Sequence, residues 1–541
     1  MAKTSSDEAG GNPFAAMLEA QARWAEMMFA PLPQLAKDGD ADAPTALSDM
    51  QKWAENATRL QTMWLEFCQS HAIEATGEMM AGDPAKWFAM FETWTEQLPF
   101  ADPAEQQRWW AESAQLWQAL MLPQGDADGD DGGKLELPRE DRRFADPRWR
   151  EQPVFALLHQ TYLMLTERVL AMVEKMDQVD PAKREQLKFA TQAMAEALSP
   201  ANFAATNPIV LDRIMESRGE SLVNGMQNLL RDIQKGQLTH TDPEAFVLSE
   251  NLATTPGKVV HETPLFQLIQ YEPSTEKVLG VPLIIFPPWI NRFYILDLNE
   301  KKSFVKWALD QGLTVFMVSW KSADSSMKDI VWDDYIAAQI EAIDHVRKRL
   351  RQPHVHAIGY CVAGTTLAAT LALLAAREEA DKVKSATFFT AQIDFTDAGD
   401  LLHFVDDQQI AAIQGLKRDG YLDGRFMAAT FNLLRGNDLI WNYVVRNYLL
   451  GEDHTAFDLL HWNGDVTNLP AKWHRDYLQD LYRDNLLVKP GRLQALGTPI
   501  DLRKVEVPTY VQAGKDDHIA PASSVWKITE HFRGPLRFVL A

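Results

Sequence analysis

The segment Val355-His356-Ala357-Ile358-Gly359-Tyr360-Cys361-Val362-Ala363-Gly364-Thr365 has the composition of a strand, a tight turn and the start of a helix. A short apolar run ends at a glycine, and small residues surround the cysteine that follows. A segment rich in alanine and leucine then extends to Ala376. Small residues are needed at such a turn because the strand and the helix pass each other closely.

Gly359, Cys361 and Ala363 have the spacing of a nucleophile elbow, glycine-x-nucleophile-x-glycine, with alanine in the last place. The positive N-terminus of the following helix favours an anionic thiolate. The backbone N–H of Val362 is expected to supply half of an oxyanion hole. We therefore predict that Cys361 is a nucleophile. The alternative is a buried cysteine in an ordinary strand-to-helix turn.

Composition limits the class of protein. The chain has 541 residues, more than one ordinary core holds, so two or more domains are expected. A net charge of −22 argues against nucleic-acid binding and fits a soluble cytoplasmic protein. Only Cys68 and Cys361 occur as cysteines, which argues against a disulfide framework. The N-terminus has no secretory signal pattern, and no apolar run is long enough to span a bilayer.

The second half of the chain alternates strand and helix patterns. Continuous apolar runs that suit buried parallel strands occur at 281–286, 314–320, 355–360, 386–390, 509–512 and 536–540, with helical patterns at 303–311 and 332–350. The fold class predicted is α/β, with a mostly parallel sheet in a catalytic domain over 243–541. A segment at about 397–483 breaks the alternation, and we expect it to form a cap over the sheet.

The first half of the chain is predicted to be helical. Residues 1–122 contain four amphipathic, tryptophan-rich patterns, at 14–29, about 50–67, 87–94 and 109–121. Their apolar faces predict either simple helix packing or a surface for a hydrophobic partner, and the sequence does not separate the two. An acidic glycine- and aspartate-rich linker follows at 123–140, and then helices at 155–176, 181–198 and 207–235 within a part spanning 141–242.

A nucleophile elbow requires an acid and a base later in the chain. The strand at 509–512 is followed by the loop Ala513-Gly514-Lys515-Asp516-Asp517-His518-Ile519-Ala520-Pro521. A carboxylate in the loop after this strand is where the acid of an α/β-hydrolase belongs. The alternative is an ordinary acidic loop with no catalytic role. Thirteen scattered histidines show no metal-ligand cluster.

Together these segments resemble the polyhydroxyalkanoate synthases of the long, single-component class (class I). Long, rare strings carry the resemblance: Gly359-Tyr360-Cys361-Val362-Ala363-Gly364, Asp141-Arg142-Arg143-Phe144, Ser199-Pro200-Ala201-Asn202-Phe203, Pro287-Pro288-Trp289-Ile290-Asn291, Tyr294-Ile295-Leu296-Asp297-Leu298, Asn437-Asp438-Leu439-Ile440-Trp441-Asn442 and Trp462-Asn463-Gly464-Asp465. The resemblance implies an α/β-hydrolase fold with a cap, preceded by an all-helical N-terminal region.

The resemblance implies Cys361 as the acyl-bearing nucleophile and Asp517 as the triad acid. His518 matches a histidine that is not the family's general base. That base lies in a Gly-x-Ser-Gly-His string after the strand at 536–540, and the sequence stops at Ala541. We therefore expect poor activity from these 541 residues alone, with His518 and the more distant His531 as weak substitutes. Ala363 stands where the family usually has glycine. The second oxyanion donor is expected near Ile290.

The activity implied is acyl transfer. A (3R)-hydroxyacyl-CoA, with a short side chain such as 3-hydroxybutyryl, is polymerised into polyhydroxyalkanoate through a cysteine thioester, and CoA is released without any cofactor. The implied partners are the substrate, the growing polyester granule in the cytoplasm and a second copy bound through the cap, with no nucleic acid. Two alternatives remain: a thioesterase or depolymerase on the same fold, and a non-catalytic granule-associated subunit.

Overall fold

The computed structural model describes residues 43–71, 141–176, 179–405, 407–415 and 419–541. The chain divides into two compact units, Met1–Glu55 and Asn56–Ala541, and the second holds the sheet, the cap and the helices from residue 141 onward. The helix α2 (Ala43–His71) confirms the pattern expected at about 50–67. The other three N-terminal patterns and the acidic linker lie outside the described residues.

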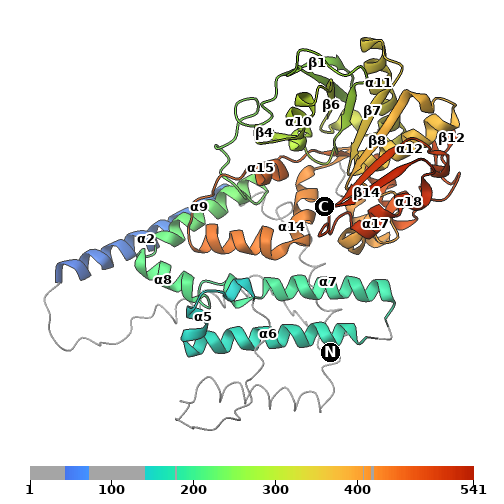
Figure 1. Cartoon of the computed structure of the whole chain (residues 1–541). Coiled ribbons are helices and arrows are strands. Elements are labelled where there is room, and N and C mark those ends of the chain that lie inside the picture. Colours follow the sequence, from blue (N-terminus) through green and yellow to red (C-terminus); the bar gives the residue numbers. More distant parts are fainter. Residues whose placement is uncertain (1–42, 72–140, 177–178, 406, 416–418) are drawn as a thin grey trace, which may run out of the picture. The chain divides into compact units, whose positions relative to one another are not determined.

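An eight-stranded sheet forms the centre of the second unit, in the order β1-β2-β6-β3-β7-β8-β13-β14 (Figure 1). The strands are β1 (Gly257–Glu262), β2 (Phe266–Tyr271), β3 (Leu283–Phe286), β6 (Val315–Trp320), β7 (Val355–Tyr360), β8 (Val383–Phe389), β13 (Thr509–Ala513) and β14 (Leu536–Leu540). The six strands from β6 to β14 are parallel, whereas β2 pairs antiparallel with both β1 and β6. The mostly parallel sheet predicted from the continuous apolar runs is confirmed.

Side chains of the central strands alternate between two apolar layers. Ile284 and Phe286 of β3 face the larger cluster, which includes α11 (Trp332–Leu350) and α12 (Val362–Ala376). Leu283 and Ile285 face a smaller cluster against α10 (Phe304–Asp310). Helix α12 is buried on every side from Val362 to Leu374, which explains why its sequence shows no polar face. The helix that carries the nucleophile is thus fixed in the middle of the core.

A helical layer precedes the sheet. It contains α5 (Arg148–Glu151), α6 (Pro153–Glu174), α7 (Pro181–Ala197), α8 (Pro208–Glu216) and α9 (Glu220–Lys235). Helices α6 and α7 lie side by side, joined by a hydrogen bond from the Tyr162 hydroxyl to the Ala195 carbonyl (2.8 Å) (Figure 1). The single helix predicted at 207–235 is wrong: the chain breaks at Arg218 and Gly219, which both have positive φ (53° and 84°). Glycine adopts this conformation readily, and it begins a new helix here.

The segment between β8 and β13 interrupts the alternation of sheet strands and helices and contains the residues 397–483 for which a cap is predicted. Its elements are η6 (Gly399–Phe404), α13 (Asp407–Gly415), β9 (Tyr421–Leu422), α14 (Gly424–Leu434), η7 (Asn437–Trp441), η8 (Val444–Leu449), α15 (Asp458–Gly464), β10 (Leu469–Pro470), α16 (Ala471–Asp476) and η9 (Tyr477–Arg483). Three of these, η7, η8 and η9, are π-helical. Such turns are rare and are frequent at functional sites.

Short elements complete the described chain. They are η1 (Arg142–Phe144), η2 (Pro200–Asn202), η3 (Phe293–Leu296), β4 (Asp297–Asn299), β5 (Lys302–Ser303), η4 (Ser325–Met327), η5 (Ala380–Lys382), β11 (Gln494–Ala495), β12 (Thr498–Pro499), η10 (Leu502–Lys504), α17 (Ala522–Trp526) and α18 (Ile528–His531). Within the part of the chain described, no helix is both long and apolar enough to cross a bilayer.

Candidate active site

Cys361 occupies a sharp turn between β7 and α12. Its backbone has φ 51° and ψ −129°, a region that ordinary residues avoid and that nucleophile elbows use. Its N–H donates to the Phe389 carbonyl at the end of β8 (3.0 Å), and its carbonyl accepts from Gly364 (2.8 Å) and Thr365 (3.1 Å). The strained turn is thus held from both sides by backbone hydrogen bonds.

The turn depends on two glycines that face each other. A Cβ at Gly359 would lie 2.5 Å from the Gly364 Cα, and a Cβ at Gly364 would lie 2.8 Å from the Gly359 carbonyl oxygen. The residue that requires close approach is therefore Gly364. Ala363, the last position of the predicted motif, is fully buried and tolerates its methyl group. Its carbonyl accepts a hydrogen bond from Gln339 (3.0 Å).

The Cys361 thiol lies in apolar surroundings but keeps part of its surface accessible. Burial raises the pKa of the thiol to about 11, the Val362 N–H lowers it, and the negative charge of Asp517 raises it further. At neutral pH the sulfur is therefore protonated. A reaction at this sulfur requires a base to remove the proton.

Backbone N–H groups without a helical acceptor follow Cys361 in the chain. The N–H groups of Val362 and Ala363 are at the first turn of α12, where no intrahelical acceptor exists. On the facing loop the carbonyls of Trp289 and Ile290 accept from the hydroxyl and the N–H of Thr467. The Ile290 N–H has no acceptor among the described residues. These donors suit a developing oxyanion.

Asp517 lies in the turn after β13, and β8 separates β13 from the elbow strand β7 in the sheet. Its Oδ1 accepts the N–H groups of Ile519 and Ala520, both at 2.9 Å. The other carboxylate oxygen has no hydrogen bond among the described residues. Its negative charge raises the pKa of both Cys361 and Tyr360. Asp517 therefore interacts electrostatically with the nucleophile turn.

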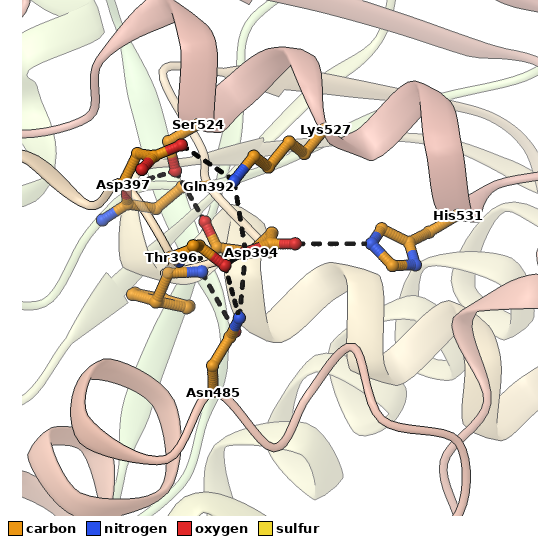
Figure 2. Close-up of polar contacts among 9 residues, drawn as sticks. Gln392, Asp394, Thr396, Asp397, Asn485, Ser524, Lys527 and His531 are labelled. Atoms are coloured by element: carbon orange, nitrogen blue, oxygen red, sulfur yellow. Dashed lines mark hydrogen bonds and ion pairs between the residues drawn. The ribbon is translucent and has the colours of Figure 1, made fainter.

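Neither candidate histidine bonds to the thiol. The His518 carbonyl accepts the Asp400 N–H (3.1 Å), and burial lowers the pKa of its ring, as does the charge of Arg435 in the cap. The Nε2 atom of His531 lies 3.7 Å from the Asp394 carboxylate, as Figure 2 shows. Among the described residues no imidazole hydrogen-bonds to Cys361.

Aromatic side chains of the segment at about 397–483, which the sequence predicts to shield the site from water, form an aromatic wall with Trp289 and Tyr335. Trp289 stacks on Tyr335 (4.0 Å between ring centroids), Trp473 stacks on Tyr477 (5.0 Å), and Tyr477 contacts Tyr482 edge to face (5.4 Å). Burial raises the pKa of both Tyr477 and Tyr482, and the charge of Cys361 raises each further. The two cap tyrosines therefore lie near the nucleophile.

Comparison with known proteins agrees with this site. Residues 140–308 match the family model for the poly-beta-hydroxybutyrate polymerase (PhaC) N-terminus, and residues 282–540 match the alpha/beta hydrolase fold. The poly(3-hydroxyalkanoate) polymerase subunit PhaC of Rhizobium meliloti is 45% identical over 433 residues, 79% of this chain and 70% of that protein. The PhaC subunit of Cupriavidus necator is 41% identical over 442 residues, 80% of this chain and 73% of its own length.

A third relative is the poly(3-hydroxyalkanoate) polymerase of Methylorubrum extorquens, 45% identical over 413 residues, covering 75% of this chain and 68% of that protein. All three alignments extend over most of both chains, so they include the helical layer as well as the sheet. With this identity over more than two thirds of each relative, the chain belongs to the poly(3-hydroxyalkanoate) polymerase family and has an α/β-hydrolase fold.

Proposed function

We propose that this protein polymerises (3R)-hydroxyacyl-CoA thioesters into polyhydroxyalkanoate, with Cys361 as the acyl-bearing nucleophile. The observation that carries the proposal is the strained cysteine elbow beside Asp517 in a chain 41–45% identical to named polymerases. A cysteine suits this chemistry because it exchanges one thioester for another at little cost in free energy, and CoA leaves readily as a thiolate.

The chemistry proceeds in two transfers. The Cys361 thiol loses its proton and its sulfur attacks the thioester carbon. The bond to the CoA sulfur breaks, the CoA thiolate takes up a proton, and the acyl group remains on Cys361. The hydroxyl of a chain end or monomer then loses its proton and attacks this acyl group, which forms an ester and frees the thiol. Water would compete for the same intermediate, and the aromatic wall excludes it. No cofactor takes part.

The proton on Cys361 determines how fast the first transfer runs. Because the pKa of the thiol is raised to about 11, little thiolate exists at neutral pH. Since no imidazole among the described residues hydrogen-bonds to Cys361, we propose that full activity needs a family-type base in a Gly-x-Ser-Gly-His string. Asp517 orients that base and balances its charge.

The finer assignments remain part of the proposal. We propose that the monomer has a short side chain, as in 3-hydroxybutyryl-CoA. We propose that the protein acts at the surface of a cytoplasmic polyester granule and attaches to it through residues 1–122. We also propose a homodimer formed through the cap at about 397–483. Deleting residues 1–122 and finding unchanged granule association would reject the attachment role.

The test is release of CoA from 3-hydroxybutyryl-CoA. It compares the chain, its Cys361→Ser variant and a form extended after Ala541 by a segment with the Gly-x-Ser-Gly-His string. We expect the extended form to release CoA fastest, the chain to be slow and Cys361→Ser to be inactive. Failure of the extended form to release CoA would leave the alternative of a non-catalytic granule-associated subunit.

A further inference from the structure

Two cap tyrosines share one side of a helix because that helix is a π-helix. Tyr477 and Tyr482 are five residues apart at the start and near the end of η9 (Tyr477–Arg483). On an α-helix, residues five apart point about 140° away from each other. In a π-helix the hydrogen bonds run from i to i+5, so such residues lie one above the other. The two rings accordingly contact each other at 5.4 Å.

Gln392, in the loop after β8, holds Tyr482. Its Nε2 donates to the Tyr482 hydroxyl oxygen (3.2 Å), and its side-chain carbonyl accepts from the Ser524 hydroxyl (3.0 Å). Its backbone carbonyl accepts from the Thr365 hydroxyl (2.6 Å). Thr365 is in the first turn of the nucleophile helix, since its N–H donates to the Cys361 carbonyl. Gln392 thus joins Tyr482 to the elbow through two hydrogen bonds.

The next residues of the same loop anchor the end of η9. Asn485 follows η9 with a positive φ of 46°. Its Oδ1 accepts the Phe395 N–H (3.0 Å), and its Nδ2 donates to the Asp394 carboxylate (2.9 Å). Figure 2 shows Asp394 at the centre of this cluster, with Lys527 and His531 approaching from the C-terminal helices. The cap helix is therefore fixed to the sheet where Tyr482 enters the site.

The Tyr482 hydroxyl accepts one hydrogen bond and has its own hydrogen left to donate. The side chain is buried, and its oxygen accepts from the Gln392 Nε2–H group (3.2 Å); burial raises the pKa of Tyr482, and the bond from Gln392 opposes this rise. Its own hydroxyl hydrogen has no acceptor among the described residues. A buried donor without an acceptor costs about 1–3 kcal/mol. Because Gln392 and Thr365 join this hydroxyl to the elbow, the carbonyl oxygen of an acyl group on Cys361 would be an acceptor close to it.

We propose that the Tyr482 hydroxyl donates a hydrogen bond to the carbonyl oxygen of the acyl group transferred to Cys361, and that Gln392 is the positioning residue that aims it. The proposal rests on the proposed function. When the sulfur attacks, the carbonyl oxygen becomes an oxyanion, and this hydrogen bond strengthens as charge develops. It then weakens as the bond to the CoA sulfur breaks.

The test is a double-mutant cycle on the full chain. Single-turnover acylation of Cys361 by 3-hydroxybutyryl-CoA is followed by intact-protein mass spectrometry between pH 7 and pH 10.5. As the pH rises, a larger fraction of Cys361 is thiolate, so the reaction no longer needs a base to remove the proton. Tyr482→Phe should slow acylation about 10- to 100-fold. Gln392→Leu should slow it about 10-fold, and the double variant should be no slower than Tyr482→Phe, since Gln392 acts through that hydroxyl.

The concentration of CoA thioester that half-saturates the rate should change little in both single variants, because the hydrogen bond forms fully only in the transition state. Gln160→Leu, a buried glutamine in α6, is the matched control and should acylate within about twofold of the unmodified chain. The inference would be overturned, and the proposed function would stand, if the rate reductions of the two single variants added up in the double variant. An unchanged acylation rate in Tyr482→Phe would have the same meaning. An unmodified chain that is not acylated at any pH would overturn the proposed function together with the inference.

Discussion

At the residue scale the protonation of one sulfur governs reactivity. The ordinary pKa of 9.0 for a cysteine is raised in Cys361 to about 11, first by burial and then by the charge of Asp517. The helix N-terminus and the Val362 N–H oppose this shift without cancelling it. Burial in the elbow thus keeps the sulfur protonated until a base acts.

Alkylation measures this directly. In a Cys68→Ser background, the rate of modification by iodoacetamide should be low at pH 7 and should rise through a midpoint near 11. Asp517→Asn removes a negative charge, so the midpoint should move to lower pH. A midpoint near 8, or one that Asp517→Asn leaves in place, would contradict the account.

Gly364 gives a second test at this scale. Gly364→Ala would place a methyl group 2.5 Å from the Ala391 Cβ and 2.8 Å from the Gly359 carbonyl oxygen. Overpacking of this kind should lower the free energy of unfolding by about 2–3 kcal/mol, measured by urea denaturation. Gly280→Ala is the control, because a Cβ there meets nothing within 4 Å. If Gly364→Ala and the unmodified chain had equal free energies of unfolding, β7 and α12 would be able to move apart without loss of stability.

At the element scale the loop after β8 connects the elbow, the cap and the C-terminal helices. Asp394 is 8% exposed and accepts from Thr396 and Asn485, with Lys527 and His531 nearby. Burial alone would raise its pKa, but the nearby His531 and the hydrogen bonds from Thr396 and Asn485 outweigh burial and hold the pKa well below the ordinary 3.8. A lowered pKa means that the folded state favours the carboxylate.

Asp394→Asn should therefore destabilise the protein by about 2 kcal/mol at pH 7. The contribution of Asp394 is complete above its ordinary pKa of 3.8 and is lost as the pH falls below that value. The variant and the unmodified chain should thus differ in urea denaturation at pH 7 and converge as acid protonates Asp394. A difference that persists unchanged at low pH would assign the effect to packing instead of charge.

Particular elements show which parts of the fold and the site the sequence predicts, and why other parts could not be predicted. The strands of the sheet, the helix at 332–350 and the elbow followed from apolar runs and from the spacing around Cys361. The break at Gly219 was missed because the apolar pattern continues across it. Tyr477 and Tyr482 were missed because five-residue spacing matches neither strand nor α-helix, and only the π-helix aligns them. Gln392 carries no motif, since its partners come from distant segments.

At the scale of the second unit the helical layer and the cap support each other. The Asn228 side chain of α9 donates to the Asn447 carbonyl of η8 (3.1 Å), and the Tyr448 hydroxyl donates to Asp232 (2.6 Å). Gly225 faces the Tyr448 backbone so closely that a Cβ there would lie 2.6 Å from its carbonyl carbon. Helix α9 thus contacts the cap element η8 through hydrogen bonds and close backbone packing.

Gly225→Leu should force α9 away from η8. We expect faster cleavage of the helical layer by protease and a lower unfolding temperature, because backbone atoms cannot yield to the added side chain. Gly464→Ala is the matched control at the same boundary, since its Cβ would meet Gln237 at an ordinary 3.7 Å. The alkylation profile of Cys361 should be unchanged in both variants, and a shifted profile would mean that the elbow depends on this layer.

The most direct test of the central claim is to identify the acylated residue. The chain is mixed with 3-hydroxybutyryl-CoA near pH 10, quenched in acid and digested, and its peptides are analysed by mass spectrometry. The account predicts a hydroxybutyryl group in thioester linkage on the peptide that contains Cys361, removed by hydroxylamine and absent from Cys361→Ser. Acylation at any other residue, or none at Cys361 while CoA is released, would contradict it.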